Sequence, residues 1–167
     1  MNKKQQDQKL SDWLQRHKGL LLRVTRSFAA TSHDRDDLLQ EVVLQVWRSI
    51  PRYTSKVAES TWIYRVALYT AVSWTRKESK HNDVRNEFTG EPVADAPAAD
   101  PRVDWLYEKI AELDPIDRSL ALLMLDGLSY REISDTLGLS ENNVGVRLNR
   151  IRKQLTAKLD REGRHEL

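Results

Sequence analysis

Amide and basic side chains gather on one face of a helix predicted between residues 141 and 155. At about 100° per residue, Asn142, Val146 and Asn149 point away from the apolar stripe of that helix. Asparagine and arginine are side chains that form bidentate contacts with the edges of DNA bases. The pattern therefore predicts a DNA-reading surface. Its candidate residues are Asn142, Asn143, Val146, Arg147, Asn149, Arg150 and Lys153.

Two helices joined by a tight turn are expected to position these side chains. Ser129 and Glu132 form a capping box at the start of the first helix, and Gly138 ends it, because glycine readily adopts the left-handed conformation of a helix stop. Ser140 can cap the second helix. A short helix, a turn with glycine and a basic second helix describe a helix-turn-helix. The alternative is an ordinary amphipathic helix pair with a solvated basic face.

A second set of candidates mixes aromatic and basic side chains around a helix predicted from Ser60 to Lys77. Such side chains can stack on unpaired bases while they neutralise phosphates. The alternative is that the tryptophans are core residues. The candidates in this helix and the loop before it are Tyr53, Lys56, Trp62, Arg65, Tyr69, Arg76 and Lys77.

Acidic side chains crowd the start of a further helix, predicted from about Asp36 to Ile50. They suit the positive end of the helix dipole, and they also suit a docking site for a basic partner. The residues alone leave both interpretations open. The apolar stripe of this helix is wider than one domain face needs, so part of it is a candidate interface.

Overall composition narrows the function classes. The chain has 167 residues, 40% of them hydrophobic and 31% charged, which is typical of a soluble globular protein. It has no long apolar run and no signal-peptide core, so we expect a cytoplasmic protein without membrane insertion. The four histidines are scattered, cysteine is absent, and no phosphate loop or nucleophile elbow is present. We therefore expect no catalytic residue, metal, cofactor or small-molecule substrate.

The hydrophobic periodicity predicts an all-α protein of two small helical domains joined by a flexible acidic linker. The first domain is expected to be a three-helix bundle, and the second a four-helix unit that ends in the helix-turn-helix. The expected segments are a disordered N-terminus (1–9), the first domain (10–80, with helices at 10–30, 36–50 and 60–77), the linker (81–100) and the second domain (101–161).

Charge is distributed unevenly between these segments. Residues 78–101 carry six acids against two cations, whereas residues 141–161 carry six cations against two acids. A basic module beside an acidic connector suggests a nucleic-acid surface and a segment kept away from it.

Three segments in this order resemble the extracytoplasmic-function (ECF) sigma factors, the small two-domain members of the sigma-70 family. The segment DLLQEVVLQVW (37–47) is similar to the region-2 helix that binds polymerase. TWIYRVALYTAVSWTRK (61–77) is similar to the promoter-melting helix, and residues 113–155 are similar to region 4. The resemblance covers about residues 15 to 158.

The resemblance implies a promoter-specificity subunit that binds core RNA polymerase, recognises the −35 and −10 promoter elements and helps to melt DNA. It implies that region 4 enters the major groove at the −35 element and meets the β flap, while residues 52–59 and the helix after them open the −10 element. An anti-sigma factor is a further expected partner. Docking on the β′ coiled coil is implied for Asp37, Leu38, Gln40 and Glu41.

Three positions depart from the family pattern. Tyr69 stands where asparagine is usual, and Ser73 where aspartate is usual. Gly145 follows Asn143-Val144 where a basic residue normally follows Thr-Val. A mid-helix glycine costs on the order of 1 kcal/mol relative to alanine, which either a close approach to DNA or tight packing within the domain would justify.

A second hypothesis is a stand-alone helix-turn-helix transcriptional regulator that binds duplex DNA as a dimer. Its N-terminal half would then be a dimerisation or ligand domain. Such a regulator needs neither the acidic helix start nor the aromatic and basic helix, so these two segments discriminate between the hypotheses.

Overall fold

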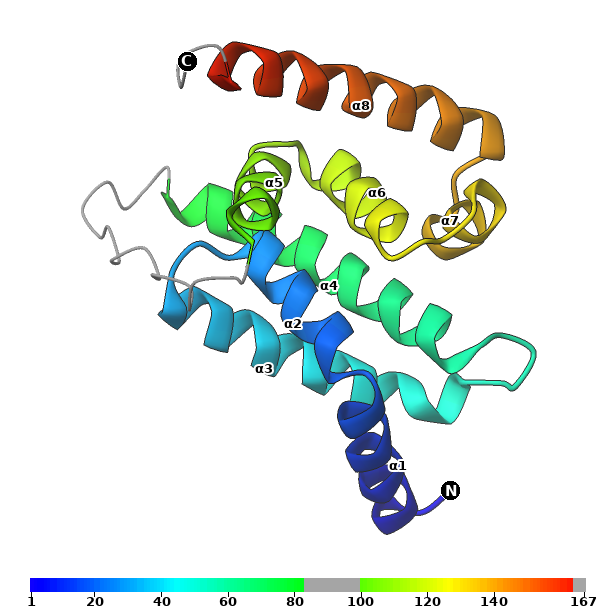
Figure 1. Ribbon diagram of the computed structural model, residues 1–167. Coiled ribbons are helices and arrows are strands. Elements are labelled where there is room, and N and C mark those ends of the chain that lie inside the picture. The colour runs from blue at the N-terminus through cyan, green and yellow to red at the C-terminus, as the bar shows by residue number, and fades with distance from the viewer. Residues whose placement is uncertain (83–99, 164–167) are drawn as a thin grey trace. The chain divides into compact units, whose positions relative to one another are not determined.

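The computed structural model describes residues 1–82 and 100–163 of the chain (Figure 1). Every regular element in these ranges is a helix, which confirms the predicted all-α class. Two compact units are present, Met1–Ala99 and Asp100–Leu167. None of the described helices combines the length and the apolarity that a membrane span requires. The helices are α1 (Lys3–Arg16), α2 (Lys18–Phe28), α3 (Ser32–Ser49), the 3₁₀ helix η1 (Ile50–Arg52), α4 (Glu59–Asn82), α5 (Pro101–Ala111), α6 (Pro115–Leu125), α7 (Tyr130–Leu137) and α8 (Glu141–Gly163).

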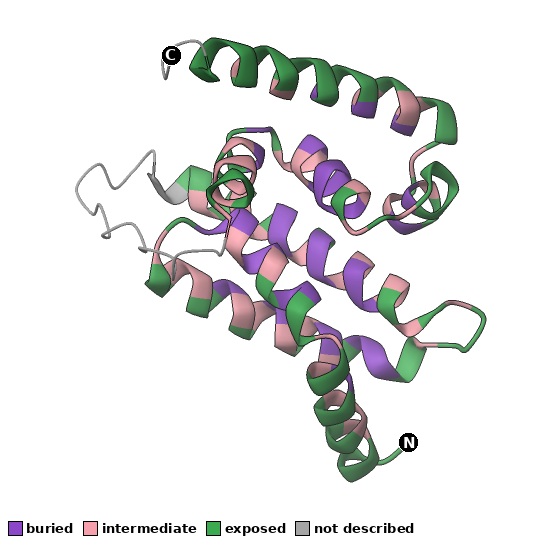
Figure 2. Cartoon of the chain, in the orientation of Figure 1, coloured by how far each residue is buried: buried purple, intermediate pink, exposed green. Residues whose placement is uncertain are grey.

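The core of the first unit lies between α2, α3 and α4, which pack against one another. Figure 2 shows the buried residues of this unit as stripes along these helices, the pattern expected of amphipathic helices. Burial of each large apolar side chain contributes roughly 1.5–3 kcal/mol. Core side chains from the three helices include Leu21, Val24, Phe28, Leu38, Val42, Val46, Ile63, Ala67 and Leu68.

The N-terminal segment differs from the prediction, because residues 3–9 are helical rather than disordered. Asn2 and Gln5 form a capping box at the start of α1. Further along α1, the Gln6 side chain donates to the Trp47 carbonyl oxygen at 2.7 Å, and the Trp47 indole donates to Asp7 at 2.8 Å. These contacts order a segment whose own hydrophobicity is low, so α1 begins seven residues before the predicted start at residue 10. The described residues of the first unit form four α-helices instead of three, because the helix predicted over 10–30 is divided in two.

Other helix boundaries also differ from the prediction. The helix expected over 10–30 is two helices, α1 and α2, separated at His17. Helix α3 begins at Ser32 because the Thr31 hydroxyl accepts from the Asp34 amide at 3.1 Å, ahead of the predicted start at residue 36. Helix α4 continues to Asn82 and so extends past the predicted end of the domain. The rest of the predicted linker, 83–99, lies outside the described residues.

The second unit is the predicted four-helix unit. Asp100 and Asp114 cap α5 and α6, each followed by a proline at the first helical position. The capping box of Ser129 and Glu132 opens α7, and Gly138 ends it with φ of 70°. Both α6 and α7 pack against α8. Their buried side chains include Leu120, Leu122, Leu123, Ile133, Val144, Leu148 and Ile151.

Candidate nucleic-acid and partner-binding surfaces

Helix α8 has a buried stripe and an exposed polar face, as the sequence predicts. Val144, Leu148 and Ile151 are fully buried. The opposite face carries Val146, which is 62% exposed, between the exposed amides of Asn142 and Asn149. Lys153 is exposed one turn further on. The structure therefore presents two amides, one apolar side chain and one cation together.

The two arginines predicted for this face make contacts that the sequence did not reveal. Arg147 Nη1 lies 2.9 Å from Asp117 Oδ1, and Arg150 Nη2 lies 2.8 Å from Asp117 Oδ2. The Asp117 side chain is 5% exposed and comes from the first turn of α6. Arg147 Nε also donates to Asn143 Oδ1 at 3.3 Å. Arg147, Arg150 and Asn143 thus form one network around a buried carboxylate.

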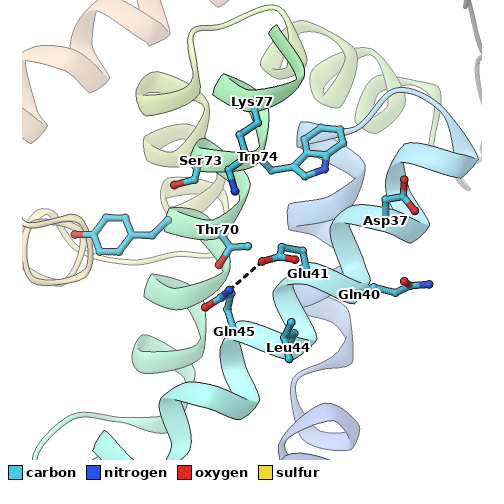
Figure 3. A pocket seen from close by; sticks show the side chains of 10 residues that line it. Asp37, Gln40, Glu41, Leu44, Gln45, Thr70, Ser73, Trp74 and Lys77 are labelled. Carbon is cyan, nitrogen blue, oxygen red and sulfur yellow. Dashed lines mark hydrogen bonds between the residues drawn. The ribbon is translucent and has the colours of Figure 1, made fainter. Parts of the chain in front are cut away.

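A groove lies between α3 and α4 in the first unit (Figure 3). On the α3 side, Asp37 and Gln40 are exposed, while Glu41 is half-buried and accepts from Gln45 Nε2 at 2.9 Å. Asp37 Oδ2 lies 3.2 Å from His33 Nε2, one turn earlier on α3. An acidic and amide-bearing edge therefore borders the groove.

Leu38 does not belong to this exposed edge. Its side chain is completely buried in the core of the first unit. A fully buried side chain is typical of a core residue, so the exposure of Leu38 does not support the docking contact predicted for it, and that contact stays a prediction. Leu44 lines the groove two turns after Asp37, with 38% of its surface exposed, and is an apolar group that the sequence pattern did not single out.

Helix α4 lines the other side of the groove with Tyr69, Thr70, Ser73, Trp74 and Lys77. Tyr69 is 49% exposed, and Lys77 is exposed two turns further along α4, so the α4 side of the groove carries aromatic, hydroxyl and basic groups. Tyr69 and Ser73, two of the three departures from the family pattern, both lie in this groove.

Tyr53 and Trp62 form part of an aromatic cluster at the base of the loop that joins η1 to α4. The Tyr53 ring lies edge-on to Trp13, with ring centroids 5.1 Å apart, and 5.7 Å from the centroid of Trp62. Tyr53 donates to the Val57 carbonyl oxygen at 2.8 Å, and Trp62 donates to Ser49 at 3.0 Å. Both rings are half-buried, so much of their surface supports the loop.

The remaining basic candidates of the first unit differ in exposure. Lys56 is exposed in the loop, and Arg76 is exposed near the end of the described part of α4. Arg65 is half-buried. Across the described residues, no cluster of three His, Asp or Glu side chains could hold a metal ion.

Two family models match the chain, one over each unit. Sigma-70 region 2 matches residues 13–81, and Sigma-70 region 4 matches residues 104–155. Together these matches cover more than half of the chain. The chain therefore belongs to the sigma-70 family, the promoter-specificity subunits of RNA polymerase.

Curated relatives narrow this class to the ECF sigma factors. The ECF sigma factor SigE of Mycolicibacterium smegmatis is 28% identical over 153 residues, which cover 85% of this chain and 58% of that relative. The sigma factor NccH of Alcaligenes xylosoxydans is 28% identical over 160 residues, with 87% of this chain and 84% of the relative covered. This chain is thus similar to a little over half of the length of SigE and to most of NccH.

A solved structure shows the same fold. The sigma factor RpoE of Bartonella quintana, in complex with the anti-sigma factor NepR, superposes with a TM-score of 0.73. The identity is 20%, and the match covers 89% of this chain and 97% of that one.

Proposed function

We propose that the chain binds core RNA polymerase through the groove edge of α3 and reads the −35 promoter element with the exposed face of α8. The observation that carries the first part is the exposed pair of Asp37 and Gln40 beside a groove that contains the apolar Leu44. An acidic rim around an apolar contact suits a basic, partly apolar helical partner such as the β′ coiled coil.

The test of polymerase binding is a charge reversal at the groove, Asp37→Arg. We expect affinity for core polymerase to fall at least tenfold, about 1.4 kcal/mol, because a cation would face the basic partner. Asp36→Arg is the matched control, since Asp36 is exposed in the same turn of α3 but does not line the groove. Co-elution with sigma-free core polymerase on size-exclusion chromatography, followed by titration, measures both variants. Equal binding by Asp37→Arg and wild type would count against the docking surface.

For the −10 element, we assign direct contacts to Lys56, Tyr69, Arg76 and Lys77, whose exposure supports this role. Tyr53 and Trp62 are assigned to support of the loop, because their polar atoms donate within the unit. Arg65, which is half-buried, is kept in the set as a phosphate contact. Extrusion of a base costs a few kcal/mol of unstacking, which aromatic and basic contacts would offset.

For the −35 element, Asn142, Val146 and Asn149 are the proposed base contacts, and Lys153 is a proposed phosphate contact. Asparagine amides pair with adenine, and an apolar side chain can contact a thymine methyl group. We place the β flap as a further contact of region 4. All of these actions are binding steps, so the protein is proposed to act in the cytoplasm without catalysis of its own.

An anti-sigma factor is a proposed further partner. One solved structure of similar fold holds the sigma factor RpoE in complex with the anti-sigma factor NepR, and another holds CnrH in complex with the cytosolic domain of CnrY. The stand-alone dimeric regulator is not favoured, because a dimerisation or ligand domain would not be expected to match Sigma-70 region 2, as residues 13–81 do. Tight binding of the free chain to a palindromic duplex in a gel shift, without polymerase, would revive that alternative.

A further inference from the structure

Asp117 occupies an unusual position for an acidic residue of a DNA-binding unit. Its side chain is 5% exposed, and each carboxylate oxygen accepts from a different arginine of α8, Arg147 and Arg150. The Asp114 side chain caps the same turn and accepts from the Asp117 amide at 3.0 Å. The negative charge therefore lies at the positive end of α6 and between two cations, which offset the cost of removing it from water.

Each of the two arginines gives only part of its hydrogen-bond donors to this carboxylate. A guanidinium has five N–H donors in a rigid planar fork. Each arginine gives one donor to Asp117, and Arg147 gives a second to Asn143. The Arg150 side chain is still 53% exposed and that of Arg147 31% exposed. The contacts with Asp117 therefore fix the orientation of each fork and leave other donors exposed to solvent along α8.

We propose that Asp117 is a positioning residue for sequence readout by α8. It holds the guanidinium groups of Arg147 and Arg150 so that their remaining donors meet base edges in the major groove instead of the nearest phosphates. This inference rests on the proposed role of α8 at the −35 element.

The physical reason is a competition between two kinds of contact. A guanidinium group at the end of a flexible arginine side chain is attracted to any phosphate, and that attraction carries no information about the DNA sequence. Bidentate recognition of a base requires the fork in one orientation, and a side chain that is held in that orientation beforehand loses less entropy on binding. Removal of the Asp117 charge should therefore shift both arginines from base contacts toward phosphate contacts.

The ion pairs at the other end of α8 provide a contrast. Glu112, which follows the last residue of α5, lies 2.6 Å from Lys158 Nζ and 3.3 Å from Lys109 Nζ, and its side chain is 46% exposed. It also joins α8 to a neighbouring helix, but it contacts none of the proposed readout residues. Glu112→Gln therefore changes net charge and interhelical contacts as Asp117→Asn does, without touching Arg147 or Arg150.

The test is a selection with the full chain assembled on core polymerase. Wild type, Asp117→Asn and Glu112→Gln are each incubated with duplexes that are randomised across the −35 element, and the bound DNA is sequenced. For Asp117→Asn we expect base preference to fall about tenfold at one or two positions and to persist at the others. Binding to scrambled duplex should rise and depend more steeply on salt. Glu112→Gln should reproduce the wild-type preferences.

The remaining outcomes are decisive as well. An unchanged preference profile in Asp117→Asn would overturn the inference. Loss of preference at all positions, together with a lowered melting temperature, would show that Asp117 only stabilises the unit. Absence of any upstream preference in the wild type would instead refute the proposed −35 function itself. If Asp117→Asn does not fold, Arg150→Lys replaces it, because lysine keeps the charge beside Asp117 but lacks the fork. A wild-type profile for Arg150→Lys would also overturn the inference.

Discussion

A β-carbon added at Gly145 would lie 3.4 Å from Cε2 of Tyr130, which is an ordinary van der Waals contact. Gly145 is inside α8, and no positive φ requires a glycine there. Neither backbone conformation nor crowding within the unit therefore demands glycine at this position. The approach of a partner, such as DNA, is the explanation that the fold leaves open for Gly145.

The first prediction is that Gly145→Ala stabilises the protein. We expect the free energy of unfolding to rise by up to about 1 kcal/mol, because alanine loses less backbone entropy than glycine in a helix. Urea denaturation followed by circular dichroism measures the change. Gly138→Ala is the control and should destabilise by about 1 kcal/mol, since φ at Gly138 is 70°.

A drop in DNA affinity for the stabilised Gly145→Ala variant, measured in the holoenzyme, would assign the glycine to a close approach of DNA. Destabilisation by Gly145→Ala would instead contradict the packing seen around Tyr130.

At the scale of elements, the C-terminal half of α8 is fastened to α5 by side chains of alternating charge. Glu162 contacts Lys109 at 2.9 Å and accepts from the Trp105 indole, while Glu112 contacts Lys158 and Lys109. The Lys158 hydrogen bond is the main cause that lowers the pKa of Glu112 below its ordinary value of 4.5. Hydrogen bonds from Trp105 and Lys109 lower the pKa of Glu162 as well.

The second prediction concerns acid sensitivity. A carboxylate whose pKa is lower in the folded state stabilises the fold above about pH 4.5 and loses that contribution as pH falls through the lowered value. Glu112→Gln should therefore lower the melting temperature slightly at pH 7, where exposure keeps the contribution of the pair small, and should flatten the further fall in melting temperature below pH 4.5 by the same amount. Glu108→Gln is the control, because Glu108 is 70% exposed and lies 3.9 Å from Lys109. Identical acid profiles for both variants would refute the prediction.

Helix α1 shows how distant contacts order a polar segment. Its N-terminal half is anchored to Trp47 through Gln6 and Asp7, and Lys9 Nζ lies 5.0 Å from the centroid of the Tyr53 ring. Near its C-terminal end, Arg16 Nη2 contacts Glu59 at 3.0 Å, at the start of α4. Helix α1 therefore contacts both ends of the loop that precedes α4.

The third prediction is that deletion of residues 1–9 destabilises the first unit. We expect a loss of about 1–3 kcal/mol, because two side-chain hydrogen bonds to α3 and the two cation–π contacts of Lys9, with Trp13 and Tyr53, disappear. Amide hydrogen exchange should also accelerate in the loop 53–58. Replacement of the exposed Lys3 and Lys4 by alanine is the control and should change neither quantity. A deletion that changes neither the stability nor the hydrogen exchange would support the disorder that the sequence predicts for residues 1–9.

The helices that carry their own start and stop signals could be predicted from the sequence, because caps act within one turn. Ser129, Glu132 and Gly138 delimited α7 correctly, and the Asp-Pro pairs located the starts of α5 and α6. The first half of α1, residues 3–9, and the network around Asp117 could not be predicted, because the partners that order them are far away in the chain. Asp117 lies thirty residues before Arg147, and only the packing of α6 on α8 brings them together.

At the scale of the whole molecule, each of the two units has its own buried core, and each carries a different part of the proposed function. The groove of α3 and α4 belongs to the first unit, and the readout face of α8 belongs to the second. Since the core side chains of each unit come from its own helices, separation of the two should preserve both folds. Domains of this size are marginally stable but do fold alone.

The last prediction uses two fragments, residues 1–82 and residues 100–167. Each should be helical and unfold cooperatively, and fragment 1–82 should bind core polymerase with an affinity within about tenfold of the full chain, because the docking groove lies wholly within it. Asp37→Arg in fragment 1–82 should abolish co-elution, which separates specific docking from adhesion of an isolated domain. Binding of core polymerase by fragment 100–167 alone would place the principal docking surface in the second unit, and α3 would then need another role. Because each fragment is also tested for cooperative unfolding, a failure to bind can be attributed to the surface and not to the loss of the fold.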